Sequence, residues 1–249
     1  MLSRFSLAGI LCIGMTSLAN LASAEEGKGW SGEVGLNGAR TTGNNDTTDV
    51  GFAFKLNNRG SDWRHNLKGT ADYGEAKGKT NKRRYRLGYK IGRDLAPRIY
   101  GFANADYYSE DFGAFKHGYY LGVGAGYSVL TDEPTEWRVE AGAGFRSQKA
   151  RLTPNDPSGL SSRLEEFASA RLFSDFDHAF DESVKLTNDT ELFYSDIDTF
   201  FINEIGVNSR MFGDFALRAS FRIEAHTDVP EGREKVDTIS RIGIVYKME

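Results

Sequence analysis

Residues 119–129 read YYLGVGAGYSV, and their side chains alternate between two kinds. The odd positions are apolar: Tyr119, Leu121, Val123, Ala125, Tyr127 and Val129. The even positions hold Tyr120, three glycines and Ser128. Because successive side chains of a β-strand point to opposite faces, this stretch predicts a strand with one apolar and one nearly bare face. Which of the two faces meets water separates a soluble protein from a membrane protein.

The same alternation recurs along the chain and predicts an all-β fold of about twelve strands. We expect the strands at 29–40, 47–57, 62–74, 83–93, 99–109, 117–130, 136–147, 164–173, 183–195, 199–211, 214–226 and 237–248. In the ninth expected strand, 183–195, Asn188 and Thr190 interrupt the apolar face. Short, turn-rich connections such as 57–62, 94–98, 131–136 and 212–215 alternate with longer polar ones such as 74–82, 109–118, 148–162 and 227–235, and 173–183 is taken as a longer turn of the first kind. This alternation is typical of an antiparallel up-and-down barrel with two unlike ends.

The first 24 residues predict a secretory signal peptide, and residues 25–249 a single barrel domain. Arg4 precedes an apolar run that ends in Ala22-Ser23-Ala24, so we expect cleavage before Glu25. The only cysteine, Cys12, lies inside this segment. No apolar stretch of about 18 residues follows that could form a transmembrane helix. The formal net charge of −4 is mild and mixed in sign, which does not suggest nucleic-acid binding.

Barrel geometry indicates that the apolar face meets lipid. About eight strands already enclose an interior that side chains just fill, so a twelve-strand barrel with its apolar face inside would contain a costly void. With the apolar face outward, the other face lines a lumen that we expect to be charged. The expected lumen-lining residues are Arg138, Glu140, Arg146, Lys185, Asp189, Glu191, Arg218, Arg222 and Glu224. Five glycines, at 122, 124, 126, 142 and 144, would also face inward and leave room for bulky charged neighbours.

The aromatic residues fit two girdles at the membrane interfaces. With the N-terminus in the periplasm, the periplasmic girdle would contain Trp30, Trp63, Trp137, Tyr127 and Tyr246. The outer girdle would contain Tyr73, Tyr85, Tyr107, Tyr119 and Tyr194. Aromatic residues also cap strand ends in general, so this sorting is consistent with a membrane barrel without proving one.

Several stretches resemble a bacterial family of salt-induced outer-membrane proteins, a domain family without an assigned function. They are GEVGLNGARTTGNNDTTDVGFAFKL, WRHNLKGTADYGE, RYRLGYKIGRDL, YYLGVGAGYSVL followed by WRVEAGAGFR, and HTDVPEGREKVDT near the end. The resemblance is weakest over 149–200 and implies an outer-membrane barrel with no catalytic residues. Such barrels often end on an aromatic residue, whereas this chain ends Tyr246-Lys247-Met248-Glu249, so we expect the terminal signal read by the assembly machinery to be weaker or shifted.

A search for catalytic chemistry yields one weak candidate. There is no G-x-S-x-G motif, and we predict no catalytic, cofactor-binding or metal-binding residue. His65 fits an interfacial position, and His178, in the turn FDHAFDES, fits a solvated acidic turn better than a metal site. His117 and His226 fall near the outer rim. A lipid-modifying enzyme acting around His226 is therefore the alternative, although Ser220 lies about 20 Å from it at strand rise.

The expected function is that of a non-catalytic barrel in the outer membrane of a Gram-negative bacterium. It would be either a channel for small solutes or ions, with the charged lumen setting selectivity, or an envelope-stabilising scaffold whose charges plug the barrel. The link to salt or osmotic stress comes from the resemblance alone. A soluble periplasmic barrel is a third reading. Expected partners are outer-membrane lipid and, during biogenesis, periplasmic chaperones and the barrel-assembly machinery, with no nucleic acid and no cofactor. The sequence leaves the oligomeric state open, a monomer being one option.

Overall fold

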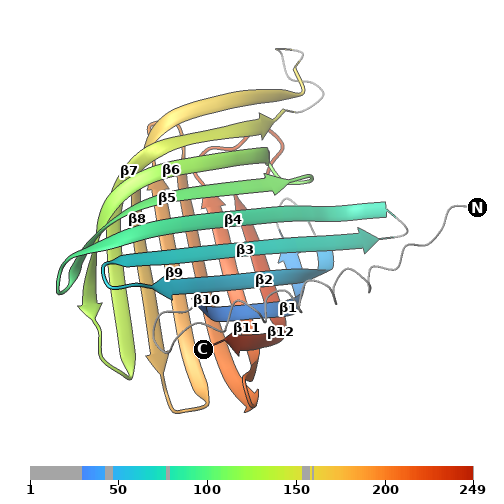
Figure 1. The fold of residues 1–249 in the computed structure, drawn as a ribbon. Coiled ribbons are helices and arrows are strands. Elements are labelled where there is room, and N and C mark those ends of the chain that lie inside the picture. The colour runs from blue at the N-terminus through green and yellow to red at the C-terminus, as the bar shows by residue number, and fades with distance from the viewer. Residues whose placement is uncertain (1–29, 43–46, 77–78, 153–157, 159, 249) are drawn as a thin grey trace, which may run out of the picture.

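The computed structural model describes residues 30–42, 47–76, 79–152, 158 and 160–248. Within them the chain forms twelve strands joined into one closed barrel (Figure 1). The strands are β1 Trp30–Thr42, β2 Thr47–Arg59, β3 Trp63–Ala76, β4 Lys79–Ala96, β5 Ile99–Glu110, β6 Phe115–Leu130, β7 Thr135–Arg151, β8 Ser162–Ala179, β9 Val184–Tyr194, β10 Thr199–Phe212, β11 Phe215–His226 and β12 Val236–Met248. The predicted all-β, twelve-strand antiparallel barrel is confirmed. The expected signal peptide lies outside the described residues.

Every strand pairs with its neighbours in sequence, and β1 closes the ring on β12. Leu36 of β1, for example, lies opposite Phe52 of β2 and opposite Ile244 of β12. Closure leaves no row of unpaired backbone groups, which hydrocarbon would not tolerate. The strands are steeply tilted, so the front wall crosses the rear wall at a large angle in Figure 1.

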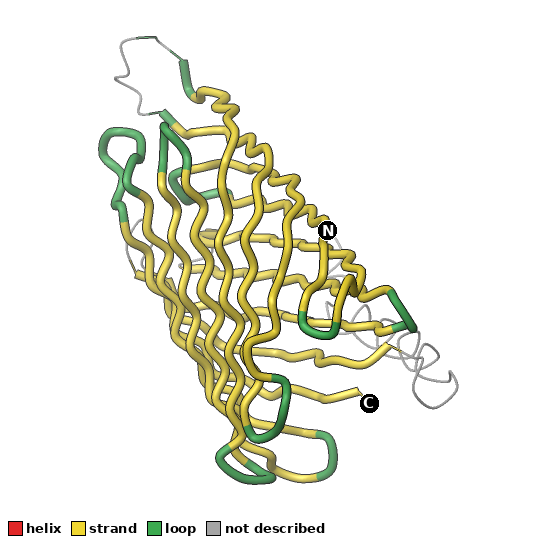
Figure 2. Tube along the Cα trace, turned by 90° about the vertical axis from the view of Figure 1, so that its left-hand side faces the viewer, coloured by secondary structure: helices red, strands yellow, loops and turns green. Residues whose placement is uncertain are grey.

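The barrel has two different ends, which can be followed in Figure 2. Connections 60–62, 97–98, 131–134, 180–183 and 213–214 lie at one end, together with the first and last described residues. We call it the turn end. Connections 111–114, 195–198 and 227–235 lie at the other, the loop end, together with the described strand ends Thr42, Thr47, Ala76, Lys79, Arg151 and Ser162. The predicted alternation of connections is thus correct, but the predicted turn at 173–183 is too long. β8 continues to Ala179, so His178 lies in a strand and not in a turn.

The outer face is apolar and exposed, whereas the inner face is polar and buried. On β6, Leu121 is 53% and Val123 is 65% exposed, and on the distant β12 Ile242 is 59% exposed. Inside the barrel, the side chains of Arg84 and Arg171 are only 2% exposed. Apolar exposure around the whole circumference cannot be stable in water. The barrel is therefore a membrane protein with its apolar face toward lipid, as the alternation in 119–129 predicts. No helix in the described part of the chain is long and apolar enough to cross a membrane.

Most of the ten aromatic residues predicted for the girdles lie near the strand ends, whereas Tyr85 and Tyr119 lie further inside β4 and β6. At the turn end, Trp63 and Tyr127 are exposed on the outer face, and at the loop end so are Tyr107 and Tyr194. Their role as girdles stays a prediction. The two residues that interrupt β9, Asn188 and Thr190, also face outward. The Thr190 hydroxyl accepts from Asn203 Nδ2 (2.8 Å) and donates to Asn188 Oδ1 (3.2 Å), which partly shields these groups from lipid.

The inward glycines of β6 and β7 face each other across the two strands, with Gly122 opposite Gly144 and Gly124 opposite Gly142. The prediction that charged side chains fill the space over them is wrong. A Cβ atom on Gly122 would lie 2.5 Å from the Tyr120 ring, and one on Gly126 would lie 2.2 Å from the Tyr100 ring. Aromatic rings therefore lie directly on the glycine backbone. The charged groups occupy the space in front of these rings.

Candidate functional site: the charged lumen

The lumen contains two cavities that share part of their walls. The turn-end cavity has a volume of about 780 Å³ and extends from the level of Asn57 and Lys247 to that of Asp189. The loop-end cavity, of about 250 Å³, extends from Asp189 to Arg146 and Phe200. The residues that line both are Glu33, Lys55, Lys68, Phe173, Asp189 and Arg218. We call this shared ring the junction.

The structure places eight of the nine expected lumen residues on the walls of these cavities. Arg146, Glu191 and Arg222 line the loop-end cavity, whereas Arg138, Glu140 and Lys185 line the turn-end cavity. Asp189 and Arg218 belong to the junction. The ninth, Glu224, lies behind the wall and is paired with Arg222 and Arg86. Whether these residues select solutes is a separate question, taken up under the proposed function.

At the junction, two lysines lie side by side. Lys55 of β2 is the direct cross-strand partner of Lys68 of β3. Neither forms a salt bridge with any described residue, since the shared carboxylates Glu33 and Asp189 lie beyond ion-pair distance of both. Like charges directly opposite each other destabilise a sheet. Asp189 attracts Lys55 across the lumen without closing to an ion pair. The lysine pair therefore places two positive charges at the passage between the cavities.

In the turn half, Glu140 is the centre of an ion-pair cluster. Lys90 Nζ of β4 lies 2.6 Å from Glu140 Oε1, and Arg171 Nη1 of β8 lies 2.9 Å from Glu140 Oε2. The Tyr100 hydroxyl donates to the same carboxylate over 2.8 Å, and Arg171 Nε reaches Glu191 at 2.5 Å. The expected neighbours Arg138 and Glu140 do not pair with each other. Arg138 pairs instead with Asp175 of β8, at 2.8 Å.

In the loop half, Glu224 of β11 is the centre of a second cluster that crosses the lumen. Its Oε2 atom lies 2.8 Å from Arg86 and 3.5 Å from Arg84, both on β4, and its Oε1 atom lies 2.6 Å from Arg222. Arg84 also pairs with Glu110 at 2.8 Å. β4 and β11 are not neighbours in the barrel. The pairs to Arg84 and Arg86 therefore bridge opposite walls and narrow the passage toward the loop end.

The basic residues that β4 contributes to both clusters were not predicted from the sequence. Arg84, Arg86 and Lys90 alternate with the apolar residues Tyr85, Leu87, Tyr89 and Ile91 that identify the strand. Their inward orientation follows directly from the period of two, so the signal was present in RYRLGYK. Their partners on distant strands carry no such signal.

At the loop end, His226 forms a buried pair with Asp198. His226 Nδ1 lies 2.6 Å from Asp198 Oδ2, and its ring stacks on Phe200 with centroids 4.0 Å apart. Phe115 covers it from another side, at 5.0 Å. The Asp198 carboxylate also accepts the backbone N–H groups of Thr227 and Asp228. This arrangement ties the connection 195–198 to the connection 227–235.

A His–Asp pair is one part of a hydrolytic site, and a nucleophile is the other. The second ring nitrogen of His226 makes no hydrogen bond to a hydroxyl among the described residues. His226 also faces the lumen and is enclosed by aromatic rings, away from lipid. The geometry therefore does not favour the lipid-modifying enzyme considered from the sequence.

The His226–Asp198 pair predicts a pH dependence at the loop end. The pKa of Asp198 lies below its ordinary 3.8: burial alone would raise it, but the hydrogen bond and charge of His226 and the Asp228 amide outweigh burial. A carboxyl with a depressed pKa in the folded state contributes stability above its unfolded pKa, and this is lost as the pH falls through the folded pKa. The Thr227 and Asp228 amides should thus exchange hydrogen faster below about pH 3.8 than their intrinsic rates explain. Asp198→Asn should remove the step, and a step that persists in this variant contradicts the assignment.

The other histidines lie on the outer face or at its rim. His65 is bonded to the Tyr89 hydroxyl at 2.8 Å near the turn end, in keeping with an interfacial position. His117 is exposed near the loop end. His178 lies 2.8 Å from the Thr135 hydroxyl and packs edge-on against Phe180. Within the described ranges, no group of three or more His, Cys, Asp or Glu side chains could hold a metal ion.

Solved structures of other proteins have a fold similar to that of this barrel. The chain is similar to the NanC porin, with a TM-score of 0.53 and 12% identity over 86% of this chain and 98% of that chain. It is also similar to the translocator domain of the autotransporter NalP from Neisseria meningitidis, with a TM-score of 0.51 and 12% identity over 96% and 95% of the two chains. At this identity the likeness concerns the fold alone. No curated protein matches the sequence.

A family model described as "Protein of unknown function, DUF481" matches residues 33–248, which include almost all of the barrel. The match covers the lysine pair of the junction and both ion-pair clusters. The chain therefore belongs to the DUF481 family.

Proposed function

We propose that this barrel is a non-catalytic outer-membrane channel for small hydrophilic solutes, with a preference for anions. The observation that carries the proposal is the pair of cavities joined at Lys55 and Lys68, inside a barrel whose outer face is apolar. The wall of the turn-end cavity carries nine basic and six acidic side chains, and that of the loop-end cavity seven basic and five acidic. Both walls are therefore positive, although the chain as a whole has a net charge of −4.

Charged rings in a narrow passage select ions by sign, and low-dielectric walls strengthen their field. An anion entering the turn-end cavity would meet the two lysines at the junction. The cross-lumen pairs of Glu224 then restrict the passage to small solutes. The similarity to a porin fold supports the proposal, and so does the expected signal peptide, which would direct the chain to the envelope. The link to salt stress comes only from the family resemblance.

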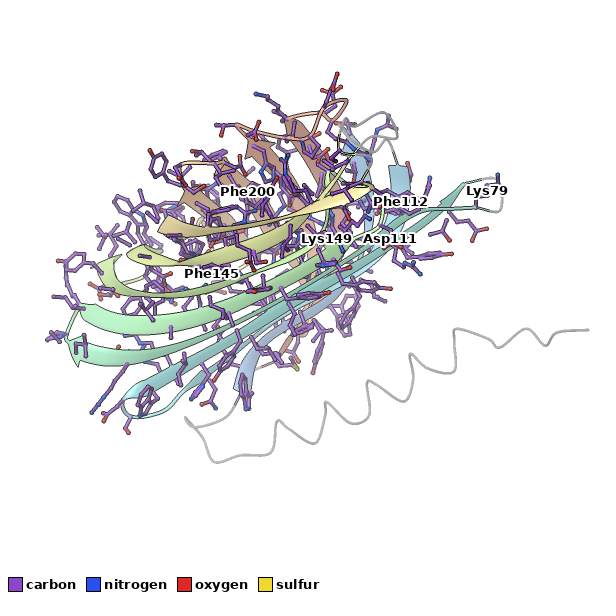
Figure 3. All side chains as sticks on the ribbon, turned by 90° about the horizontal axis from the view of Figure 1, so that it is seen from above. Lys79, Asp111, Phe112, Phe145, Lys149 and Phe200 are labelled. Atoms are coloured by element: carbon purple, nitrogen blue, oxygen red, sulfur yellow. The ribbon has the colours of Figure 1, made fainter. Side chains whose placement is uncertain are left out.

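The test is ion selectivity in planar bilayers, measured as the reversal potential in a salt gradient. Wild-type protein should conduct in steps and favour anions over cations. Replacing both junction lysines, Lys55→Gln with Lys68→Gln, should keep the conductance and reduce the anion preference several-fold, because the two unpaired charges at the junction are gone. Lys79→Gln is the matched control, since Lys79 lies at the tip of the β3–β4 hairpin, away from the lumen (Figure 3). It should leave the selectivity unchanged. A protein that inserts but never conducts would favour the plugged scaffold instead.

A further inference from the structure

One arginine of the lumen differs from all the others that are deeply buried. Arg84 and Arg171 each pair with two carboxylates. Arg146 of β7 is just as enclosed, at 4% exposure, yet no carboxylate of the described residues lies within ion-pair distance of it. Its Nη1 atom is buried and makes no hydrogen bond. A buried charge without a partner is costly, so the fold alone gives no reason for an arginine here.

The residues around Arg146 fix the position of its guanidinium but do not accept hydrogen bonds from its buried Nη1 atom. Its guanidinium lies over the Phe200 ring at 4.7 Å and over the Phe193 ring at 5.5 Å. Such stacking orients the planar group and leaves its N–H edge free to bind a ligand. Phe200 is itself held by His226, whose ring is stacked on its face. The carboxylate of Asp198 attracts Arg146 electrostatically but forms no ion pair with it. Its oxygens are hydrogen-bonded to His226 and to two backbone amides.

A second unsatisfied donor lies beside it. The hydroxyl of Tyr108, on β5, is also buried and lies beside the Arg146 guanidinium, which is close enough to donate toward its oxygen. No group of the described residues meets this hydroxyl in good hydrogen-bond geometry, so its proton has no acceptor. Both residues line the loop-end cavity. Arg86 lies over the Tyr108 ring at 5.5 Å, but its charge is paired with Glu224. Two buried donors that point into a positively charged cavity form a site for an acceptor that carries negative charge.

We propose that the loop-end cavity binds the carboxylate group of a small organic anion through Arg146 and Tyr108. A carboxylate matches the planar fork of a guanidinium with two parallel hydrogen bonds, and a third bond from the Tyr108 hydroxyl satisfies the remaining donor. The cavity of about 250 Å³ suits a small polar molecule. The inference rests on the proposed channel only for the route by which the anion arrives. It gives the channel a substrate class, organic anions, that the junction lysines alone do not define.

The experiment compares gluconate with its uncharged counterpart sorbitol, by calorimetric titration of the folded barrel in detergent micelles. Wild-type protein should bind gluconate and not sorbitol. Arg146→Met keeps an apolar stem against the two phenylalanine rings and removes the charge. It should weaken gluconate binding at least about tenfold, since charge-assisted hydrogen bonds are lost, while leaving resistance to urea unchanged or increased. A merely structural arginine would give the opposite result, namely a loss of stability.

Two further variants complete the test. Arg146→Lys keeps the charge but not the fork, so its affinity should fall between those of wild type and Arg146→Met. Arg93→Met is the control, because Arg93 also stacks on an aromatic ring, that of Trp63, but on the outer face of the barrel. It should bind gluconate as wild type does. In wild-type protein, sulfate should compete with gluconate, a measurement that does not depend on any variant folding.

The outcomes separate this site from the channel. Equal gluconate binding by wild type and Arg146→Met, or equal binding of sorbitol and gluconate, or no binding by wild type, overturns the site. Binding that depends on Arg146 in a protein without conductance overturns the channel and leaves the site standing. Anion-selective conductance without such binding does the reverse.

Discussion

Replacing Glu224 by glutamine should destabilise the barrel by about 3–5 kcal/mol, the cost of leaving buried charges without their partner. The carboxylate of Glu224 forms ion pairs with Arg84, Arg86 and Arg222 at the same time. The glutamine side chain has the same shape but no charge, so the three guanidinium groups would repel one another around a buried side chain that no longer balances them. The measurement is urea unfolding in detergent micelles, followed by tryptophan fluorescence.

The control for this variant is Asp111→Asn at the loop end. Asp111 accepts from Arg83 Nε over 2.6 Å, but both side chains are largely exposed, and solvent screens such a pair. Figure 3 shows Asp111 at the margin of the barrel, next to Phe112. The urea midpoint of this variant should match that of wild type. If Glu224→Gln were as stable as Asp111→Asn, the cluster would contribute little, and the narrow passage could not depend on it.

The second large effect is expected from Gly124→Ala, in the stretch that first indicated a strand. A Cβ atom at position 124 would lie 2.4 Å from the Ala141 carbonyl oxygen and 2.6 Å from the Phe102 ring. Because one of these neighbours is backbone, β6 and β7 would have to separate locally. We expect the free energy of unfolding to fall by about 1–3 kcal/mol, which is typical of overpacking. The measurement is gel electrophoresis of samples preheated to increasing temperatures, in which the band of the folded barrel should disappear at a lower temperature than in wild type.

Gly38→Ala tests whether the loss comes from crowding and not from the removal of a glycine in general. Gly38 also lies within a strand, but the nearest atoms to its Cβ would be the carbonyl oxygens of Asp49, at 3.9 Å, and Ile242, at 4.0 Å. With that space the substitution should change stability by no more than about 0.5 kcal/mol. Equal losses in the two variants would contradict the role given to the aromatic rings.

The alternation of side chains was enough to predict the strands and the faces of the barrel, because period two is a local property of each strand. It failed at β8, where Asp175 and Asp177 look like turn residues. In this barrel they face inward, pair with Arg138 and Lys185, and continue the strand. In soluble proteins, a run of polar residues indicates a turn because polar side chains face solvent. In a membrane barrel, polar side chains also face the lumen from within the strands, so the same residues do not distinguish a turn from a strand.

The contents of the lumen could be predicted only in part. Which residues face inward follows from the period, but which of them meet depends on the tilt and stagger of all twelve strands. The pairs Arg84–Glu224 and Lys90–Glu140 join residues 140 and 50 positions apart in number, across strands that are not neighbours. Likewise, the rings of Tyr100 and Tyr120 have room inside the barrel because Gly126 and Gly144 lie beside them on the adjacent strands. These are properties of the whole ring of strands.

The ion pairs between β4 and β11 also have a mechanical consequence. A plain ring of hydrogen-bonded strands can flatten into an ellipse at little cost, because its strands shear past one another. Here, any squeezing or spreading of the wall must pull guanidinium groups away from the buried carboxylate of Glu224. The cross-section is thus braced from within, and this protein should act as a rigid inclusion when the surrounding bilayer is stretched or compressed.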